Sequence, residues 1–231
     1  MGELHHEPFQ FACNGFLKVA FQGSRITSDA GILLVRELDE RLGLEALISE
    51  HLSDSRQGLN TQFGLVDLLR QSVYSRLAGY EDLNDAVRVS ADPTFRLIGS
   101  PKRWDRGAAL TSTLHWFETE LLTREENLVG LMAVNREVLA QAEMATRADR
   151  IVLDMDSSES PVHGAQEGSA YNGHFESVCY HPLFLFNEHG DCVAASLRPG
   201  NVPSADDWDD LLVPEIDRQQ AAGTRVAFRA D

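Results

Sequence analysis

The stretch IVLDMDSS, residues 151–158, is a short apolar β-run that carries two aspartates near its end, Asp154 and Asp156. Residues two apart on a strand point to the same face, so a single cation could contact both carboxylates. Asp156 is the stronger candidate because it stands where the strand opens into the Ser157-Ser158 turn. On spacing alone, a solvated or turn-capping role for both aspartates is an equally good interpretation.

A second run of this kind, RVAFRAD, occupies residues 225–231 and ends on Asp231. Between the two runs, the pattern predicts strands at residues 178–186 and 192–197, joined by a turn at residues 187–191. A helix is predicted after them, at residues 206–220. Strand-end aspartates in such an order are typical of a ribonuclease-H-like fold, which holds divalent metal for phosphodiester chemistry. Asp231 would have to lie on a parallel strand beside that of Asp156.

Length and composition indicate a globular protein without export or membrane signals. With 231 residues and 43% apolar content, the chain can bury a sizeable core. It has no apolar run long enough to span a bilayer and no secretory signal at its N-terminus, so we expect a cytoplasmic protein with no membrane partner. The cysteines, Cys13, Cys179 and Cys192, lack CxxC spacing, which argues against a disulfide framework and a structural zinc site.

The acidic balance restricts where nucleic acid could bind. The formal net charge is −16, and residues 151–231 hold 4 basic and 14 acidic side chains, against 16 and 22 in residues 1–150. Binding to a DNA backbone depends on clustered Lys and Arg. A divalent cation would offset part of the acidic excess in residues 151–231. If the chain binds DNA, its basic surface is therefore either local or missing.

The N-terminal part of the chain has helical periodicity. We expect a helix at residues 28–42, ended by Gly43, and a second at residues 61–77. Shorter helices are predicted at residues 81–89, 94–98, 111–122 and 124–145. The chain is therefore predicted to be of the α/β class, with a mostly α-helical domain at residues 1–148 and a mixed β-sheet domain at residues 149–231.

The N-terminal domain contains one compact basic and aromatic cluster, formed by Lys102, Arg103 and Arg106 around Trp104. Such a cluster suits contact with a phosphate backbone and stacking on a base or sugar. A solvated connector is the competing interpretation, and the more frequent one. We take the three cations as candidate DNA-binding residues.

Polar residues between the predicted strands are further candidates. Residues 161–173 (PVHGAQEGSAYNG) predict either a mobile surface loop or a substrate-facing loop, to which His163, Gln166 and Asn172 would contribute hydrogen bonds. Arg198 ends a predicted strand, where it could face a phosphate, although a plain turn is commoner. The spacing of the histidines fits no zinc pattern.

Five ordered blocks cover almost the whole chain. They are TSDAGILLVRELDERLGL (27–44), DLLRQSVYSRLAGYEDLNDAVRVSADPTFRL (67–97), LDMDSSESPVHGAQEGSAYNGHFE (153–176), PLFLFNEHGDCVAASLRPGN (182–201) and FRAD (228–231). In these blocks the chain resembles the bacterial insertion-sequence transposases with a group 1 transposase DDE domain, in the insertion-sequence family numbered 1380. Because the blocks are long and in order, the resemblance is specific.

The resemblance implies an N-terminal helical region that binds element ends or mediates assembly, followed by an incomplete ribonuclease-H-like catalytic domain. The family's first catalytic aspartate falls on Asp156, with Asp154 as the weaker assignment, and its second falls on Asp231. These carboxylates would bind Mg²⁺ or Mn²⁺, which prefer oxygen ligands. The implied partners are the DNA of element ends and target, and further copies of the chain in the complete enzyme.

The family's third acid, a glutamate on a late helix, has no counterpart in these 231 residues. Two carboxylates should bind metal weakly and orient it poorly. We therefore expect a C-terminally truncated transposase that is inactive as an isolated polypeptide. The alternative is a non-catalytic DNA-binding or dimerising fragment that regulates a full-length transposase.

Overall fold

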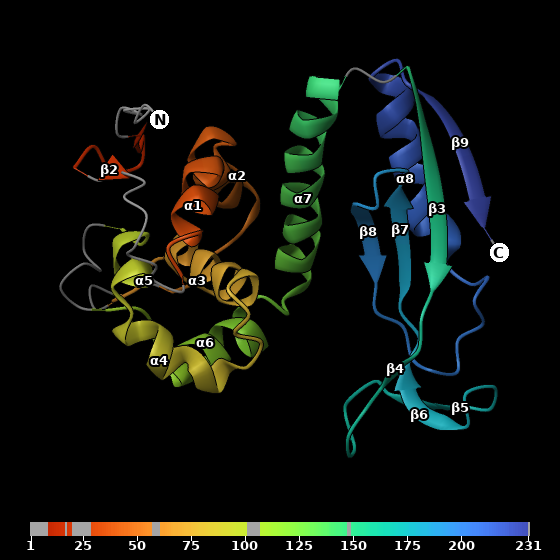
Figure 1. The fold of residues 1–231 in the computed structure, drawn as a ribbon. Coiled ribbons are helices and arrows are strands. Elements are labelled where there is room, and N and C mark those ends of the chain that lie inside the picture. Colours follow the sequence, from red (N-terminus) through yellow and green to blue (C-terminus); the bar gives the residue numbers. More distant parts are fainter. Residues whose placement is uncertain are drawn as a thin grey trace, which may run out of the picture. The chain divides into compact units, whose positions relative to one another are not determined.

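The computed structural model describes residues 9–16, 18–19, 29–56, 61–100, 107–146 and 149–230. It contains two compact units, Met1–Val134 and Asn135–Asp231, whose elements are labelled in Figure 1. The predicted α/β class is confirmed. The functional division at residues 1–148 and 149–231 stays a prediction. No helix in the described part of the chain combines the length and apolarity needed to cross a bilayer.

The first unit is mostly helical, as the periodicity predicted. It opens with a short antiparallel pair, β1 (Phe9–Gln10) and β2 (Lys18–Val19). The helices that follow are α1 (Ile32–Arg41), α2 (Leu44–His51), α3 (Leu65–Leu77), the 3₁₀ turn η1 (Leu83–Asp85), α4 (Ala86–Ala91), α5 (Pro93–Leu97), α6 (Thr111–Trp116) and the π-helical segment η3 (Phe117–Leu121). The last helix, α7 (Glu125–Thr146), begins in the first unit, and its residues from Asn135 onward belong to the second.

Local chemistry sets several of these boundaries. Gly43 takes a φ of +63° between α1 and α2, a conformation that glycine adopts without steric cost, and this confirms the predicted end of the first helix. Asp92 accepts hydrogen bonds from the backbone N–H groups of Thr94 and Phe95, so it caps α5. Residue 28, where the first helix was predicted to start, lies outside the described residues. Residues 29–31 form a turn rather than helix, and α1 begins at Ile32.

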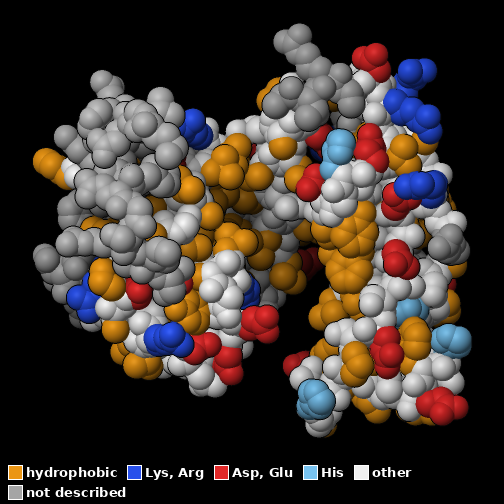
Figure 2. Space-filling model, in the orientation of Figure 1, with side chains coloured by type: hydrophobic (Ala, Val, Ile, Leu, Met, Phe, Trp, Pro, Cys, Tyr) orange, Lys and Arg blue, Asp and Glu red, His pale blue; other side chains and the backbone are white. Residues whose placement is uncertain are grey.

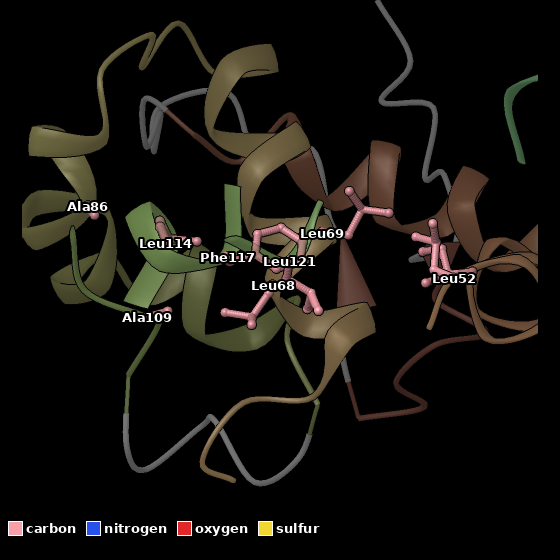
Figure 3. Packing of buried hydrophobic residues seen from close by; sticks show 9 residues of the cluster. Leu52, Leu68, Leu69, Ala86, Ala109, Leu114, Phe117 and Leu121 are labelled. Atoms are coloured by element: carbon pink, nitrogen blue, oxygen red, sulfur yellow. The ribbon is translucent and has the colours of Figure 1, made fainter. Parts of the chain in front are cut away.

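An apolar cluster joins α2, α3, α6 and η3. Figure 3 shows Leu68, Leu114, Phe117 and Leu121 meeting in this cluster, and each is buried. Burial of such side chains is the main stabilising term for a helical unit of this size. The cluster therefore fixes how these helices pack within the first unit.

A buried ion-pair network lies beside this core. Arg70 on α3 donates to both carboxylate oxygens of Asp39 on α1, from Nη2 to Oδ1 at 2.7 Å and from Nε to Oδ2 at 2.9 Å. Arg36 Nη1 and the Tyr74 hydroxyl also donate to Asp39. Burial, and then the hydrogen bond to Asp39, raise the pKa of Tyr74 well above its usual value. The network holds α1 against α3.

The second unit is built on a four-stranded sheet. Its strands are β3 (Arg150–Ser157), β7 (Leu183–Asn187), β8 (Cys192–Ser196) and β9 (Arg225–Ala230), in the order β8-β7-β3-β9. β3 pairs antiparallel with β7 and parallel with β9. Helix α8 (Trp208–Ala221) connects β8 to β9 and lies behind the sheet in Figure 1.

One face of this sheet forms the core of the second unit. Alternate residues of β3, namely Ile151, Leu153 and Met155, are buried with Leu211 and Leu212 of α8. A strand turns successive side chains to opposite faces, so the even-numbered residues of β3 lie on the other face. Figure 2 shows hydrophobic side chains on that front face, over β7 and β8. Asp154 and Asp156 lie on this front face of the sheet, opposite the α8 core.

The predicted strand at residues 178–186 is wrong, because two strands of different sheets occupy it. β6 (Ser177–Tyr180) ends before His181-Pro182, and β7 begins after it. Pro182 has no backbone N–H to donate to a neighbouring strand. Its carbonyl accepts a hydrogen bond from the Ser158 N–H, outside the pairings of the two sheets. β6 belongs to a small sheet of order β4-β6-β5, with β4 (Ser160–Pro161) and β5 (Ala170–Asn172).

Candidate active site

The candidate site lies at the end of β3, where Asp156 is exposed. Pairing of Asp156 with Phe184 on β7 fixes one side of this position. On the other side, β9 runs parallel to β3 and its register ends with Met155 opposite Ala230. The parallel neighbour that the sequence analysis required is therefore confirmed as far as Ala230. Asp231 itself lies outside the described residues.

Asp154 is already engaged by a cation that the sequence analysis did not select. Arg229 on β9 donates from Nε to Asp154 Oδ1 at 2.5 Å and from Nη2 to Oδ2 at 2.6 Å. This hydrogen bonding holds the pKa of Asp154 below its usual value. Because both carboxylate oxygens accept hydrogen bonds from the guanidinium group, Asp154 is a weaker candidate for a metal ligand than Asp156. The sequence gives no sign of this pair, because Asp154 and Arg229 lie in two distant runs and no local pattern connects them.

Metal binding stays a prediction. Within the described residues there is no group of three or more His, Cys, Asp or Glu side chains arranged to hold a metal ion. Asp156 and Asp231 would supply only oxygen ligands, which is the donor set that Mg²⁺ and Mn²⁺ prefer. The two aspartates therefore suit the expected cation in chemical type, and one of them is at an exposed strand end.

The three candidates from residues 161–173 have different surroundings. His163 and Gln166 are exposed, and the Gln166 carbonyl accepts from Ser169. The Asn172 side chain has a structural function, because its Oδ1 accepts from the N–H groups of His174 and Phe175 and its Nδ2 donates to the Gly200 carbonyl at 2.6 Å. Substrate binding by these three residues remains a prediction.

Arg198 is buried rather than presented at an open turn, with 3% of its surface exposed. Its Nε donates to the His181 carbonyl at 3.0 Å, and its Nη1 donates to the Asp206 carbonyl at 2.6 Å. Nη1 also contacts the carbonyls of Pro203 and Ser204. Nη2 is buried with no hydrogen-bond partner among the described residues. Arg198 thus braces residues 203–206 against His181, and its contact with a phosphate remains a prediction.

The candidate DNA-binding residues Lys102, Arg103 and Arg106, together with Trp104, lie outside the described residues. Nearby cations that are described take part in intramolecular contacts. For example, Arg96 Nε donates to the Ser90 carbonyl. Because the cluster itself is not described, its contact with DNA stays a prediction.

The described part of the site is one exposed carboxylate, Asp156, near the end of a strand whose parallel neighbour β9 is paired as far as Ala230. The chain matches the family described as transposase DDE domain group 1 over residues 10–231. The chain therefore belongs to this family of transposases. No curated protein and no solved structure matches the chain.

Proposed function

We propose that the chain acts in DNA transposition by the metal-dependent DDE mechanism, as a member of the insertion-sequence family numbered 1380. One observation carries the proposal. The parallel register of β3 and β9 ends at Met155 and Ala230, and the next residues in the sequence are Asp156 and Asp231. Two strand-end carboxylates are what the proposed Mg²⁺ or Mn²⁺ site requires.

The strand order also supports a ribonuclease-H-like domain. An antiparallel meander of β3, β7 and β8 leads through α8 to a strand parallel to β3. This topology brings together the two strands that carry the aspartates, although α8 and the whole meander separate them in sequence. It is the arrangement that the proposed fold requires of its first four strands.

The proposed reaction has two steps. Water attacks the phosphodiester at the element end, and the bond to the flanking strand breaks to release a 3′-OH. This hydroxyl attacks a phosphodiester of target DNA, which joins element to target and releases a target strand with its own 3′-OH. Bound divalent metal would activate the attacking oxygen and stabilise the leaving one. Asp156 and Asp231 would hold that metal, while His163, Gln166 and the Lys102, Arg103 and Arg106 cluster would contact DNA.

We further propose that a polypeptide of these 231 residues does not cleave DNA alone, because it supplies two of the family's three carboxylates. Cleavage of element-end DNA by this polypeptide, abolished by Asp156→Ala, would contradict this part of the proposal. The alternative, a regulator that joins a full-length transposase in mixed assemblies, predicts that co-expression lowers transposition. An inert chain would leave the transposition frequency unchanged.

Cation binding tests the site directly. Titration of Mn²⁺ followed by electron paramagnetic resonance should show binding to the chain, with an affinity at least about tenfold weaker in Asp156→Asn. Asp154→Asn should have the smaller effect, because Arg229 already engages that carboxylate. Asp217→Asn, at an exposed position of α8, is the matched control and should bind like the wild type. Equal affinities in all four proteins would exclude Asp156 as a ligand.

A further inference from the structure

A cavity of about 330 Å³ lies in the second unit, between the β5–β6 turn and residues 201–204. Its lining includes the rings of Tyr171, His174, Phe175 and His181. Within the described residues, no Lys, Arg, Asp or Glu lines it. We call this cavity the aromatic pocket. It therefore offers no Lys or Arg to pair with a phosphate and no carboxylate to bind Mg²⁺.

Ring contacts, and hydrogen bonds in the turn that carries two of the rings, position His174, Phe175 and His181. Phe175 meets His174 and His181 edge to face, with centroid distances of 5.0 and 5.7 Å. Asn172 fixes the turn that carries two of these rings, through its contacts with the N–H groups of His174 and Phe175. A pocket formed in advance loses little conformational entropy when a planar ligand enters.

His181 adds a polar group of defined character. It is 5% exposed, and its Nδ1 lies 2.9 Å from the Val202 carbonyl oxygen. A carbonyl only accepts, so Nδ1 must carry the proton in this hydrogen bond. This hydrogen bond holds the His181 ring against residues 201–204, which form the opposite wall of the pocket.

The pocket borders the candidate active site. Ser204, on its lining, has its Oγ 3.2 Å from the Oγ of Ser157, the residue that follows Asp156 on β3. A DNA strand whose phosphate lies at the end of β3 therefore passes beside the pocket. Tyr171 is 59% exposed, so the pocket is accessible from solvent.

We infer that the aromatic pocket holds one unpaired nucleobase of the DNA strand that passes the end of β3. The inference rests on the proposed function. Stacking on aromatic rings accepts any base, because every base has a π-face. The base would be a single-stranded one, because a base inside a duplex already stacks on its neighbours and has no free face for the aromatic rings.

Photocrosslinking tests the inference on the unmodified chain. The probe is a DNA duplex with a single-stranded extension that carries 5-iododeoxyuridine, whose uracil ring couples to aromatic side chains that stack on it. After irradiation, mass spectrometry should locate the crosslink on Tyr171, His174, Phe175 or His181. Filter retention of the same labelled DNA measures binding independently of the crosslink.

A pair of matched variants supports this measurement. Phe175→Leu should weaken retention of the extended duplex about tenfold while leaving that of a blunt duplex unchanged. Phe228→Leu removes an exposed ring on β9, outside the pocket, and should behave like the wild type. Circular dichroism confirms that both variants fold. Crosslinks elsewhere with DNA still retained would overturn the pocket and leave the proposed function standing, whereas failure to retain either DNA would overturn both.

Discussion

Arg229 and Asp154 form a two-point ion pair across the parallel strands β9 and β3, with both N–O distances at or below 2.6 Å. The pair lies on the face opposite the α8 core, one register step before Met155 and Ala230. It therefore fixes the alignment of the two strands next to the proposed metal ligands. In the proposed site, Asp154 would position the strand ends and Asp156 would provide the exposed carboxylate.

The Arg229–Asp154 pair should make stability depend on pH. The pKa of Asp154 is lower in the folded chain than its usual value, so the pair stabilises the fold above about pH 4 and this contribution is lost as pH falls through the lower, folded pKa. We expect Asp154→Asn to have a lower melting temperature than the wild type at pH 7. The difference should shrink as the pH drops below about 4. A constant difference at every pH would contradict this account.

Loss of the Asp39 charge should destabilise the first unit strongly. Asp39→Asn leaves Arg70 and Arg36 buried beside a neutral amide, and breaking a buried ion pair costs about 3–5 kcal/mol. Urea unfolding followed by circular dichroism measures this change. Glu50→Gln makes the same kind of change at an exposed position of α2, and its free energy of unfolding should stay within about 0.5 kcal/mol of the wild type.

A methyl group at Gly200 should disrupt the small sheet. An added Cβ would meet the Ala170 carbonyl oxygen at 2.4 Å and the Cys179 carbonyl oxygen at 2.5 Å. We expect Gly200→Ala to lower the free energy of unfolding by about 1–3 kcal/mol. At Gly173 an added Cβ meets nothing within 4 Å, so Gly173→Ala is the control. Equal stabilities of the two variants would show that the close approach at Gly200 is absent in solution.

Much of the fold was predictable because its signals are local. The cap at Asp92, the glycine after α1 and the turn at Asn187–Asp191 each act within a few residues, and each is found in the structure. The split between β6 and β7 was missed because the apolar pattern continues through His181-Pro182. Only the surrounding pairings assign the two halves to different sheets.

The site was predictable in part, for the same reason. Asp156 could be chosen from the end of one apolar run, but the contact between Arg229 and Asp154 depends on the register of strands far apart in sequence. Arg198 and Asn172 were selected as polar residues near turns. Their hydrogen bonds to backbone groups became visible only when residues 199–206 were placed against β5 and β6.

The parallel register also protects the fold against misalignment. Side chains alternate along a strand, so a one-residue slip of β9 would turn Arg229 from the open face toward the apolar side that Val226 shares with Leu211 and Leu212. A guanidinium there would be desolvated without a carboxylate to receive it. The slipped sheet would therefore lose the ion pair with Asp154 and would also bury an unpaired guanidinium group. Arg229 thus disfavours a one-residue slip of β9 against β3.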